Sequence, residues 1–588
     1  MPCRTSTLFR PARRGFDRTA PFASLLALPL LFAAFAAHAQ VDIRDIDRQN
    51  QVFERQQQEL LRQQQERALQ QNQRSERNPP PPTPQITVPD LGVKCREIHE
   101  IRIVGATRLP ESVRQGVVDA YSGRCLGVSE LEAILATLTK SYIDRAYVTT
   151  RAYLPAQDLR TGVLEVAVVE GTIERFELQQ SGRPDSATSI RGAFPVRPGD
   201  LLNLRDLEQG IDQLNSLSSN SATLDLQPGA RSGGSVVVVR NQASFPVGLY
   251  AGFDNLGTPQ TGRNALGATV SFASLLGLNE VIALSRRQSV PNDSEHNSSV
   301  SALHIAVPYG YNTFSFDASE SNYVNTLVLP SGLKLASEGT TSTQSLLADR
   351  VVFRDQQSRV SLSARLTSQD SRNFVGHEFL AVGSRKLSPL DLGVGGFSQL
   401  AGGVANGRVA YVRGLDAMGA LQDPADLPAN LPHAQFGKFM LDLGYSRRFD
   451  AGTQALILSS QFSGQYTRDT LYGSQQMLIG GASSVRGFMV NTLSGDSGYF
   501  LHNDLSAPWA TTVGDVPLTG RAYVGFDFGS VTNIPPGLPS GSLSGVTLGV
   551  SMGWRTLSVD LFASRAAHKP ASLPSEGTIY SIRLSCAI

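Results

Sequence analysis

The residues best suited to covalent chemistry stand in the run GDSG, from Gly495 to Gly498. This run matches the nucleophile loop of trypsin-like proteases, with Ser497 in the place of the nucleophile. Such a serine works only with a histidine and a carboxylate in a fixed geometry. The loop also needs a further glycine where this chain has Tyr499. A motif without its structural context is a weak signal, so we expect no enzyme.

Metal and cofactor signatures are absent from the sequence. The histidines are scattered without the spacing of metal ligands. No phosphate-binding loop of the GxxxxGK[ST] type occurs, so nucleotide hydrolysis cannot supply energy here. The formal net charge of +1 gives no global field that would attract nucleic acid. We therefore expect no metal, no cofactor and no nucleic-acid partner.

One arginine, Arg486, stands between small residues and an aromatic in the run GGASSVRGFMVN, Gly480 to Asn491. Two interpretations are open. Arg486 is either a solvated charge on a loop, whose replacement costs little, or it lies in a polar interior against a fixed carboxylate. A planar guanidinium suits the second interpretation because it can bind a carboxylate at two points. The elements around the run must decide between them.

Cysteine is scarce, with 4 residues in the chain. Cys3 belongs to a predicted export signal. Cys95 and Cys125 are near each other in sequence and flank one predicted strand–helix unit. Because an oxidising compartment permits disulfides, we expect these two to pair, with two free thiols as the alternative. Cys586 is expected to be a plain small apolar residue in the last strand.

The N-terminus has the pattern of an export signal over residues 1–39. Arginines precede the apolar run PFASLLALPLLFAAFA, and AHAQ supplies small residues for cleavage after Ala39. A membrane anchor is the weaker interpretation, because the run is short and contains Pro29. Residues 40–77 predict a helix that is polar on nearly every face, or else a disordered Gln-rich tail. The prolines of residues 78–92 favour a stiff, extended linker.

A weak repeat covers residues 93–171 and 172–243 and predicts two small β-α-α-β-β modules. In the first module, an S-x-x-E capping box is expected at Ser129 and Glu132. The buried helix faces are expected to hold Leu131, Ile134, Leu135, Leu138 and Tyr142 in the first module and Leu207, Ile211, Leu214 and Leu217 in the second. Such modules leave sheet edges exposed, and these edges can accept an extended peptide by strand addition.

Residues 244–588 alternate apolar and polar side chains with a period of two. The run RAYVGFDFGSV, for example, sets Ala522, Val524, Phe526 and Phe528 against Arg521, Tyr523, Gly525 and Asp527. A polar face of this kind is typical of a transmembrane barrel with lipid outside and a wet lumen, whereas a soluble sandwich would bury larger apolar residues. About 345 residues allow about 16 antiparallel strands. The expected fold class is therefore mainly β, a barrel preceded by small α+β modules.

The order of signal, polar helix, proline linker, two modules and barrel resembles the outer-membrane transporters of two-partner secretion. These form the haemolysin secretion/activation (ShlB/FhaC/HecB-like) family within the outer-membrane insertase superfamily. The modules resemble polypeptide-transport-associated (POTRA) domains. The motifs that carry the resemblance are AYVTTRAYLPAQDL, LEQGIDQLN, GFDNLGTPQTGR, LLGLNE, VPYGY, SSVRGF, GDSGYFLHNDLS and GFDFGSV.

The resemblance implies a function and a location. It implies a pore in the outer membrane of a Gram-negative bacterium, with the POTRA-like domains in the periplasm. The pore would export a large exoprotein of haemolysin, adhesin or toxin type that carries an N-terminal secretion domain. Residues 40–77 would plug the resting barrel, and membrane lipid and the barrel-assembly machinery would be further partners. An insertase for other outer-membrane proteins is the alternative, and a passive porin is disfavoured because it needs no modules.

The resemblance also implies a partner for Arg486. The loop motif is Val485, Arg486, Gly487 and Phe488, and the partner on the barrel wall is the F-D-x-G strand, with Phe526, Asp527 and Gly529. The alternation supports Asp527, because this residue shares the polar face with Arg521 and Tyr523. We expect the loop to fold back into the lumen and the ion pair to hold it there. One departure from the family is the last residue, Ile588, where such barrels commonly end in an aromatic.

Overall fold

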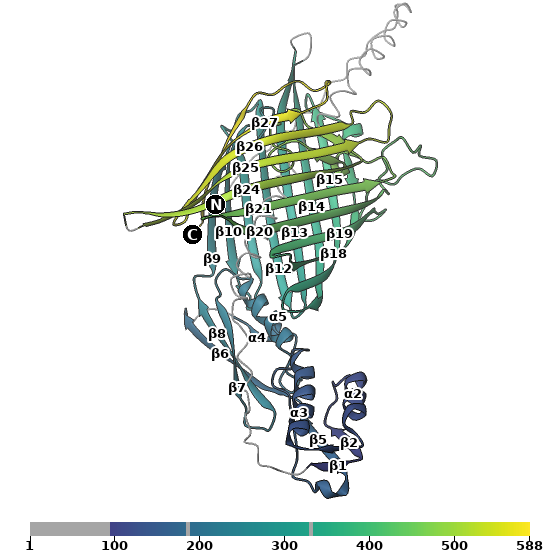
Figure 1. Cartoon of the computed structure of the whole chain (residues 1–588). Coiled ribbons are helices and arrows are strands. Elements are labelled where there is room, and N and C mark those ends of the chain that lie inside the picture. The colour runs from purple at the N-terminus through teal and green to yellow at the C-terminus, as the bar shows by residue number, and fades with distance from the viewer. Residues whose placement is uncertain (1–94, 184–187, 329–332, 515, 588) are drawn as a thin grey trace, which may run out of the picture.

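The computed structural model describes residues 95–183, 188–328, 333–514 and 516–587, which form a barrel and two small modules at one end of it (Figure 1). The predicted export signal (1–39), the polar segment (40–77), the proline-rich linker (78–92) and Ile588 lie outside the described residues. Among the helices of the described part, none is long and apolar enough to cross a membrane.

The first module has a three-stranded sheet in the order β2-β5-β4, with β2 and β5 parallel. Its α3 helix buries Ile134, Leu138 and Tyr142 completely, and Leu131 and Leu135 pack beside them, as the helical spacing predicted. The elements are β1 (Arg96–Ile98), β2 (Glu100–Val104), α2 (Glu111–Tyr121), β3 (Arg124–Leu126), α3 (Val128–Ile143), β4 (Arg151–Tyr153) and β5 (Val163–Val169).

The predicted capping box of α3 is wrong by two residues. The helix begins at Val128, so Ser129 already lies in its first turn. Gly127 is the N-cap residue, and its backbone N–H donates to the carboxylate of Glu130 at 2.8 Å. The third helical position therefore belongs to Glu130 rather than Glu132, and half of the box forms because glycine has no side chain to complete it.

The second module repeats the arrangement with sheet order β6-β8-β7, in which β6 and β8 are parallel. Leu207, Ile211 and Leu214 are buried on α5, which confirms the predicted helix face, whereas Leu217 is buried but lies beyond the end of the helix at Asn215. The side chain of Asn203 caps α5 by accepting from the backbone N–H of Arg205 at 2.9 Å. The elements are β6 (Thr172–Gly182), α4 (Ile190–Ala193), α5 (Leu204–Asn215), β7 (Ala222–Pro228) and β8 (Gly234–Ala243).

The remaining strands close into an antiparallel barrel when β28 pairs with β9. Because β16, β17 and β18 all pair with β15 along one position of the wall, the barrel has 16 strands, as predicted. The wall strands are β9 (Val247–Asp254), β10 (Asn264–Ala273), β11 (Val281–Val290), β12 (His296–Tyr309), β13 (Asn312–Val328), β14 (Lys334–Arg354), β15 (Ser358–Val375), β16 (Glu378–Phe379), β17 (Arg385–Leu387), β18 (Pro389–Leu400), β19 (Gly403–Gly414), β20 (Gly437–Ala451), β21 (Gln454–Thr467), β24 (Ser497–Val513), β25 (Val516–Thr532), β26 (Gly541–Trp554), β27 (Leu557–His568) and β28 (Ile579–Ala587).

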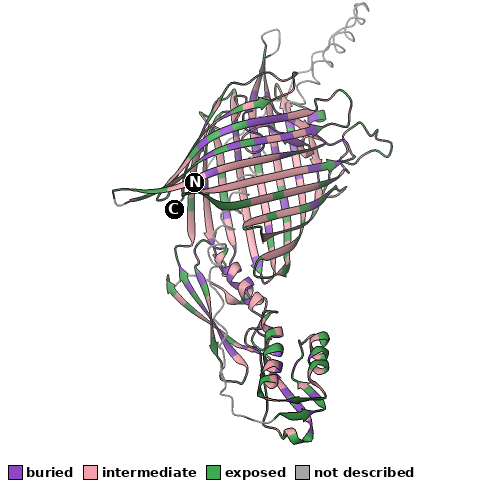
Figure 2. Cartoon of the chain, in the orientation of Figure 1, coloured by how far each residue is buried: buried purple, intermediate pink, exposed green. Residues whose placement is uncertain are grey.

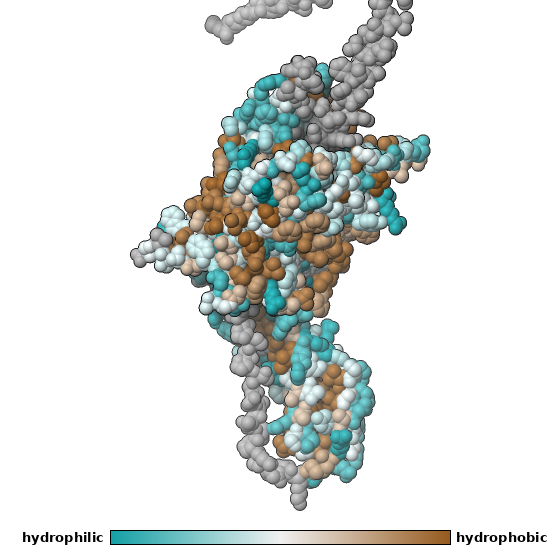
Figure 3. Space-filling model, turned by 45° about the horizontal axis from the view of Figure 1, so that its top comes forward, coloured by the Kyte–Doolittle hydropathy of each residue, from teal (hydrophilic) through white to brown (hydrophobic). Residues whose placement is uncertain are grey.

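The two faces of the wall follow the predicted alternation. On β25, Val524 and Phe526 point outward and are 51% and 52% exposed, whereas Tyr523 and Asp527 point inward and are buried. Most wall residues are intermediate in burial, as expected where one side of each strand meets the outside (Figure 2). Hydrophobic residues gather over the barrel wall in the space-filling view (Figure 3). This outer surface has the character of a lipid-facing belt.

The second module is docked against one end of the barrel, where the turn between β12 and β13 and the last residue of β14 lie. Gln209 and Gln213 of α5 both donate to the backbone carbonyl of Gly310, in the turn between β12 and β13, at 3.2 and 3.0 Å. Arg354, at the end of β14, pairs with Asp212 of the same helix at 2.5 Å. These buried contacts fix α5 against the barrel and thereby define the end from which the modules approach the lumen.

A buried arginine site inside the barrel

The run around Arg486 belongs to a long connection between β21 and β24 that folds back into the barrel. Its two short strands, β22 (Met477–Ile479) and β23 (Leu493–Gly495), pair with each other and bring the run between them toward the inner wall. Val485 and Phe488 are buried against Leu543 and Val531 of the wall. The prediction that this loop enters the lumen therefore matches its position in the structure.

Glycines on both the loop and the wall permit this close approach. Gly487 has φ +99°, and a Cβ there would meet the backbone of Arg565 and Ala566 on β27. Across from it, a Cβ on Gly545 would overlap the carbonyl of Arg486. Strand β27 has one extra residue, Ala567, opposite Ser544 and Gly545 of β26, so the loop packs against the wall where the ladder is already irregular.

Arg486 is held by Asp527 at three points. The guanidinium Nε lies 2.7 Å from Oδ2 and Nη2 lies 2.9 Å from Oδ1, which makes the two-point contact that this pair of groups favours. The backbone N–H of Arg486 also donates to Oδ2 at 3.0 Å. Arg486 is 5% exposed and Asp527 is fully buried. The interpretation of Arg486 as a solvated loop charge is therefore wrong for this structure.

Two further residues complete the site, and the sequence reasoning missed both. Asp504 accepts from Arg486 Nη2 at 2.7 Å. His502 places Nδ1 3.3 Å from Asp527 Oδ1 and Nε2 3.8 Å from Asp504 Oδ2. Both come from β24, and their inward direction was readable from the alternation in YFLHNDLS. Their position beside Asp527 depends on the β24–β25 register, which pairs His502 with Asp527 and Asp504 with Gly525.

The other members of the predicted wall motif have different positions. Gly529 faces the loop, since a Cβ there would lie 3.1 Å from the Val485 side chain. Phe526 belongs to the predicted partner motif but points to the outer face, as the alternation of the strand predicted, and does not line the site. The remaining predicted pair is a disulfide between Cys95, just before β1, and Cys125 of β3, with Cα atoms 5.2 Å apart.

The part of the loop beyond Phe488 is fixed by Glu576, from the connection between β27 and β28. Its carboxylate accepts from the backbone N–H groups of Met489, Val490 and Asn491 at 2.9, 3.1 and 2.7 Å. No periodic pattern marks Glu576 in the sequence, and only the fold brings it to the loop. Thus the loop is held on both sides of Gly487: Asp527 of the barrel wall binds Arg486 before it, and Glu576 of the β27–β28 connection binds the backbone after it.

The GDSG run holds the base of the same loop. Asp496 is fully buried and accepts from the backbone N–H groups of Leu471 and Ile534, each at 2.9 Å. Ser497 accepts from the backbone N–H of Thr467 at 3.0 Å. The run therefore ties the base of the loop to the end of β21 and to the connection between β25 and β26. Within the described ranges, no three His, Cys, Asp or Glu side chains are grouped as metal ligands.

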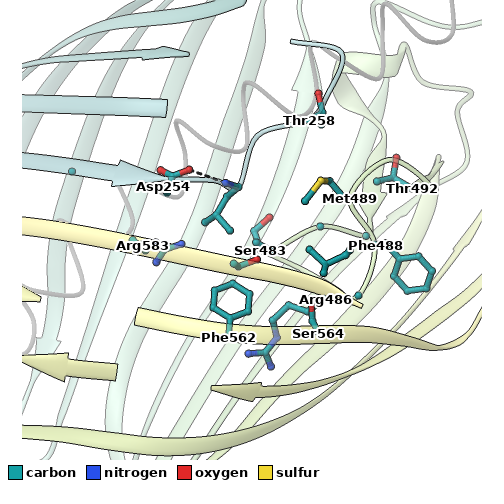
Figure 4. Close-up of a pocket in the computed structure, with 18 of the residues that line it drawn as sticks. Asp254, Thr258, Ser483, Arg486, Phe488, Met489, Thr492, Phe562, Ser564 and Arg583 are labelled. Atoms are coloured by element: carbon teal, nitrogen blue, oxygen red, sulfur yellow. Dashed lines mark hydrogen bonds between the residues drawn. The ribbon is translucent and has the colours of Figure 1, made fainter. Parts of the chain in front are cut away.

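Space remains in the lumen beside the loop. A pocket there is lined by Ser483, Arg486, Phe488 and Met489 on one side and by Phe562, Ser564 and Arg583 of β27 and β28 on the other (Figure 4). It reaches Asp254 of β9, which pairs with Arg287 of β11 at 2.6 Å. The loop thus lies next to the strands that close the barrel and leaves part of the lumen beside them open.

Comparisons with known proteins agree with this architecture. The family model described as haemolysin secretion/activation protein ShlB/FhaC/HecB matches residues 233–554, more than half of the chain. Models of an ShlB-type POTRA domain and of a POTRA domain match residues 97–171 and 172–228. The chain belongs to this transporter family. It is an outer-membrane transporter of two-partner secretion, with its POTRA domains in the periplasm.

Individual relatives of the transporter cover most of its length. The outer membrane transporter CdiB of Dickeya dadantii is 31% identical over 83% of this chain and 86% of its own. The hemolysin transporter protein ShlB of Serratia marcescens is 32% identical over 80% of this chain and 82% of its own. The solved structure of CdiB from Escherichia coli is 30% identical and superposes with a TM-score of 0.83 over 92% of this chain and 98% of its own.

Proposed function

We propose that this transporter exports one large exoprotein, and that the Arg486–Asp527 contact holds the lumen loop in the position that transport needs. The observation that carries the proposal is the buried two-point contact at 2.7 and 2.9 Å between a loop and the barrel wall. Removing one partner of a buried ion pair typically costs about 3–5 kcal/mol, because the other charge is left uncompensated. A contact of that strength can decide between two positions of a loop.

The POTRA domains supply surfaces for capture of an extended chain. In the first domain β4 pairs with β5 and lies at one edge of the sheet, and in the second β7 pairs with β8 and lies at an edge. Edge strands can add a further strand through backbone hydrogen bonds. We expect the N-terminal secretion domain of the exoprotein to bind there before it enters the barrel.

Net movement through the barrel has to come from the exported protein. The sequence has no phosphate-binding motif for nucleotide hydrolysis. An exoprotein that folds outside the cell as a long repetitive β-structure gains stability repeat by repeat, because each repeat packs on its neighbour. Such stepwise folding would bias the chain outward and is the energy source in this proposal.

The proposal is tested by exporting a candidate exoprotein in strains with and without the transporter. The expected result is export only when the transporter is present, with unchanged amounts of other outer-membrane barrels. In the strain without the transporter, the Arg486→Ala variant should fail to restore export. The Arg468→Ala variant is its matched control and should restore export, because Arg468 is an exposed arginine of the same loop. If the strain without the transporter exports normally but loses other barrels, the chain acts as an insertase and the proposal is wrong.

A further inference from the structure

The turn between β10 and β11 exposes three leucines at the end of the barrel where the second POTRA domain docks. Leu275, Leu276 and Leu278 are 56%, 71% and 52% exposed. The neighbouring turns at this end are different: residues Asp355–Gln357 between β14 and β15 are polar, and Gly310 between β12 and β13 is covered by α5. Exposed apolar clusters of this kind mark contact surfaces in water-soluble regions and membranes alike.

The leucines are presented by a turn with a fixed conformation. Glu280 is 1% exposed, and its carboxylate accepts from the backbone N–H groups of Leu276 and Leu278 at 2.6 and 3.0 Å. Asn279 has a φ of 57°, in the left-handed region that asparagine tolerates, and Ser274 has a φ of 53°, which serine adopts less often. The turn thus directs these side chains outward instead of folding them onto the barrel.

The same turn is attached to the second POTRA domain. The Asn279 side chain exchanges two hydrogen bonds with the backbone of Ser189, at 2.9 and 2.6 Å. Phe245, in the connection from this domain to β9, is 60% exposed and carries the guanidinium of Arg183 over its ring at 4.6 Å. The next residue, Pro246, accepts from the backbone N–H of Ala273 at 2.8 Å, so Phe245 lies close to the start of the turn.

These four side chains, Phe245, Leu275, Leu276 and Leu278, are called the apolar foot here. Three observations favour lipid as its occupant. The foot continues the outer face of the barrel, where Leu266 and Leu284 of the same two strands are 52% and 51% exposed. An aromatic ring beside a cationic group is typical of the membrane interface, where the ring enters the apolar layer and the cation meets phosphate. The foot also lies at the rim that faces the periplasm.

We propose that the apolar foot inserts into the periplasmic leaflet of the outer membrane, among the acyl chains, with Arg183 at the level of the lipid phosphates. Because Asn279 joins the turn to Ser189, this contact also sets how the second POTRA domain stands relative to the membrane surface. The inference depends on the outer-membrane location of the barrel and is independent of which exoprotein is exported.

The test places a fluorescent label at single cysteines in the full-length transporter, reconstituted in phosphatidylethanolamine and phosphatidylglycerol vesicles. Cys586→Ser removes the free thiol of the described residues, Cys3→Ser removes the thiol of the predicted export signal, and the Cys95–Cys125 disulfide stays unlabelled. NBD is attached at Leu276→Cys, with Leu284→Cys as the lipid-facing control. Gln357→Cys is the matched aqueous control, because it is an exposed residue on a polar turn at the same end of the barrel.

We expect the label at position 276 to behave like that at 284, with blue-shifted emission, strong quenching by spin-labelled acyl chains and at least fivefold less quenching by iodide than at 357. Leu275→Cys and Leu278→Cys repeat the measurement if Leu276→Cys fails to fold. A label at 276 that iodide quenches as well as at 357 overturns the proposal. If that label is exposed in vesicles but shielded in cells, a periplasmic protein covers the foot and the lipid assignment is equally wrong.

Discussion

Arg486 and Asp527 are 41 residues apart in the sequence and meet inside the barrel through two side-chain hydrogen bonds and one backbone hydrogen bond. Arg486 belongs to the loop between β21 and β24, and Asp527 belongs to the wall strand β25. Because both groups are buried, neither can exchange its partner for water without a large cost in desolvation. The contact is therefore suited to holding the loop in one position.

Arg486→Lys should reduce secretion strongly, although it keeps the positive charge. A lysine ammonium is a point charge that cannot reproduce the fork that reaches both oxygens of Asp527 and also Asp504. Each lost charge-assisted hydrogen bond is worth about 1.5–3 kcal/mol. We expect secretion to fall about tenfold or more, measured as exoprotein in the medium per folded barrel. Secretion at the wild-type level would show that charge alone suffices at this position.

Gly545→Ala should displace the loop without changing any charge. The added methyl group would overlap the carbonyl of Arg486, and overpacking of this kind costs about 1–3 kcal/mol. Gly267→Ala on β10 is the control, because the nearest atom to its added Cβ lies 3.9 Å away. We expect increased protease cleavage within residues 480–492 and reduced secretion for the first variant only. Equal behaviour of the two variants would contradict the close approach at Gly545.

Glu576→Gln should loosen the outer part of the loop while the Arg486 contact remains. The carboxylate receives three consecutive backbone N–H groups, and an amide has one acceptor oxygen in its place. Because Glu576 is partly exposed, the expected loss is below about 1 kcal/mol. Hydrogen exchange at Met489–Asn491 should accelerate, and secretion should fall less than for Arg486→Lys. Unchanged exchange at these three amides would show that Glu576 does not hold them.

The first POTRA domain should lose stability in acid through Glu170. Partial burial raises the pKa of this carboxyl, but hydrogen bonds from Thr107, Tyr142 and the backbone N–H of Arg108 outweigh it, and the net pKa is lowered. A lowered folded-state pKa means stability that is complete above the ordinary glutamate pKa of about 4.3 and is lost as the pH falls below it.

Hydrogen exchange of the first domain in the full-length transporter measures this effect. Between pH 6 and pH 3, protection corrected for intrinsic exchange should decrease more in the wild type than in Glu170→Gln, which has no carboxyl to protonate. Protection decreases in acid because protonation of the Glu170 carboxylate weakens the hydrogen bonds that it accepts from three donors. An identical pH dependence of the two proteins would exclude Glu170 as the titrating group.

The barrel and the modules were predictable because their signals are periodic. Alternation in RAYVGFDFGSV set Val524 outside and Asp527 inside, and helical spacing set Ile134 and Leu214 in their cores. The pairing of Arg486 with Asp527 needed the family resemblance as well, since alternation alone offers several inward residues. Asp504 and His502 depend on strand register and Glu576 on the course of a long connection, and neither leaves a local pattern. The frame of the α3 cap was misassigned because Ser129 and Glu132 satisfy the same spacing as Gly127 and Glu130.

The most direct test of the account is a double-mutant cycle on secretion with Arg486→Ala, Asp527→Ala and the double variant, each compared at equal amounts of heat-modifiable, folded barrel. If the contact holds the loop for transport, each single variant loses most secretion and the double variant is little worse than either, because both remove the same interaction. Normal secretion by Arg486→Ala at wild-type barrel levels would contradict the central claim.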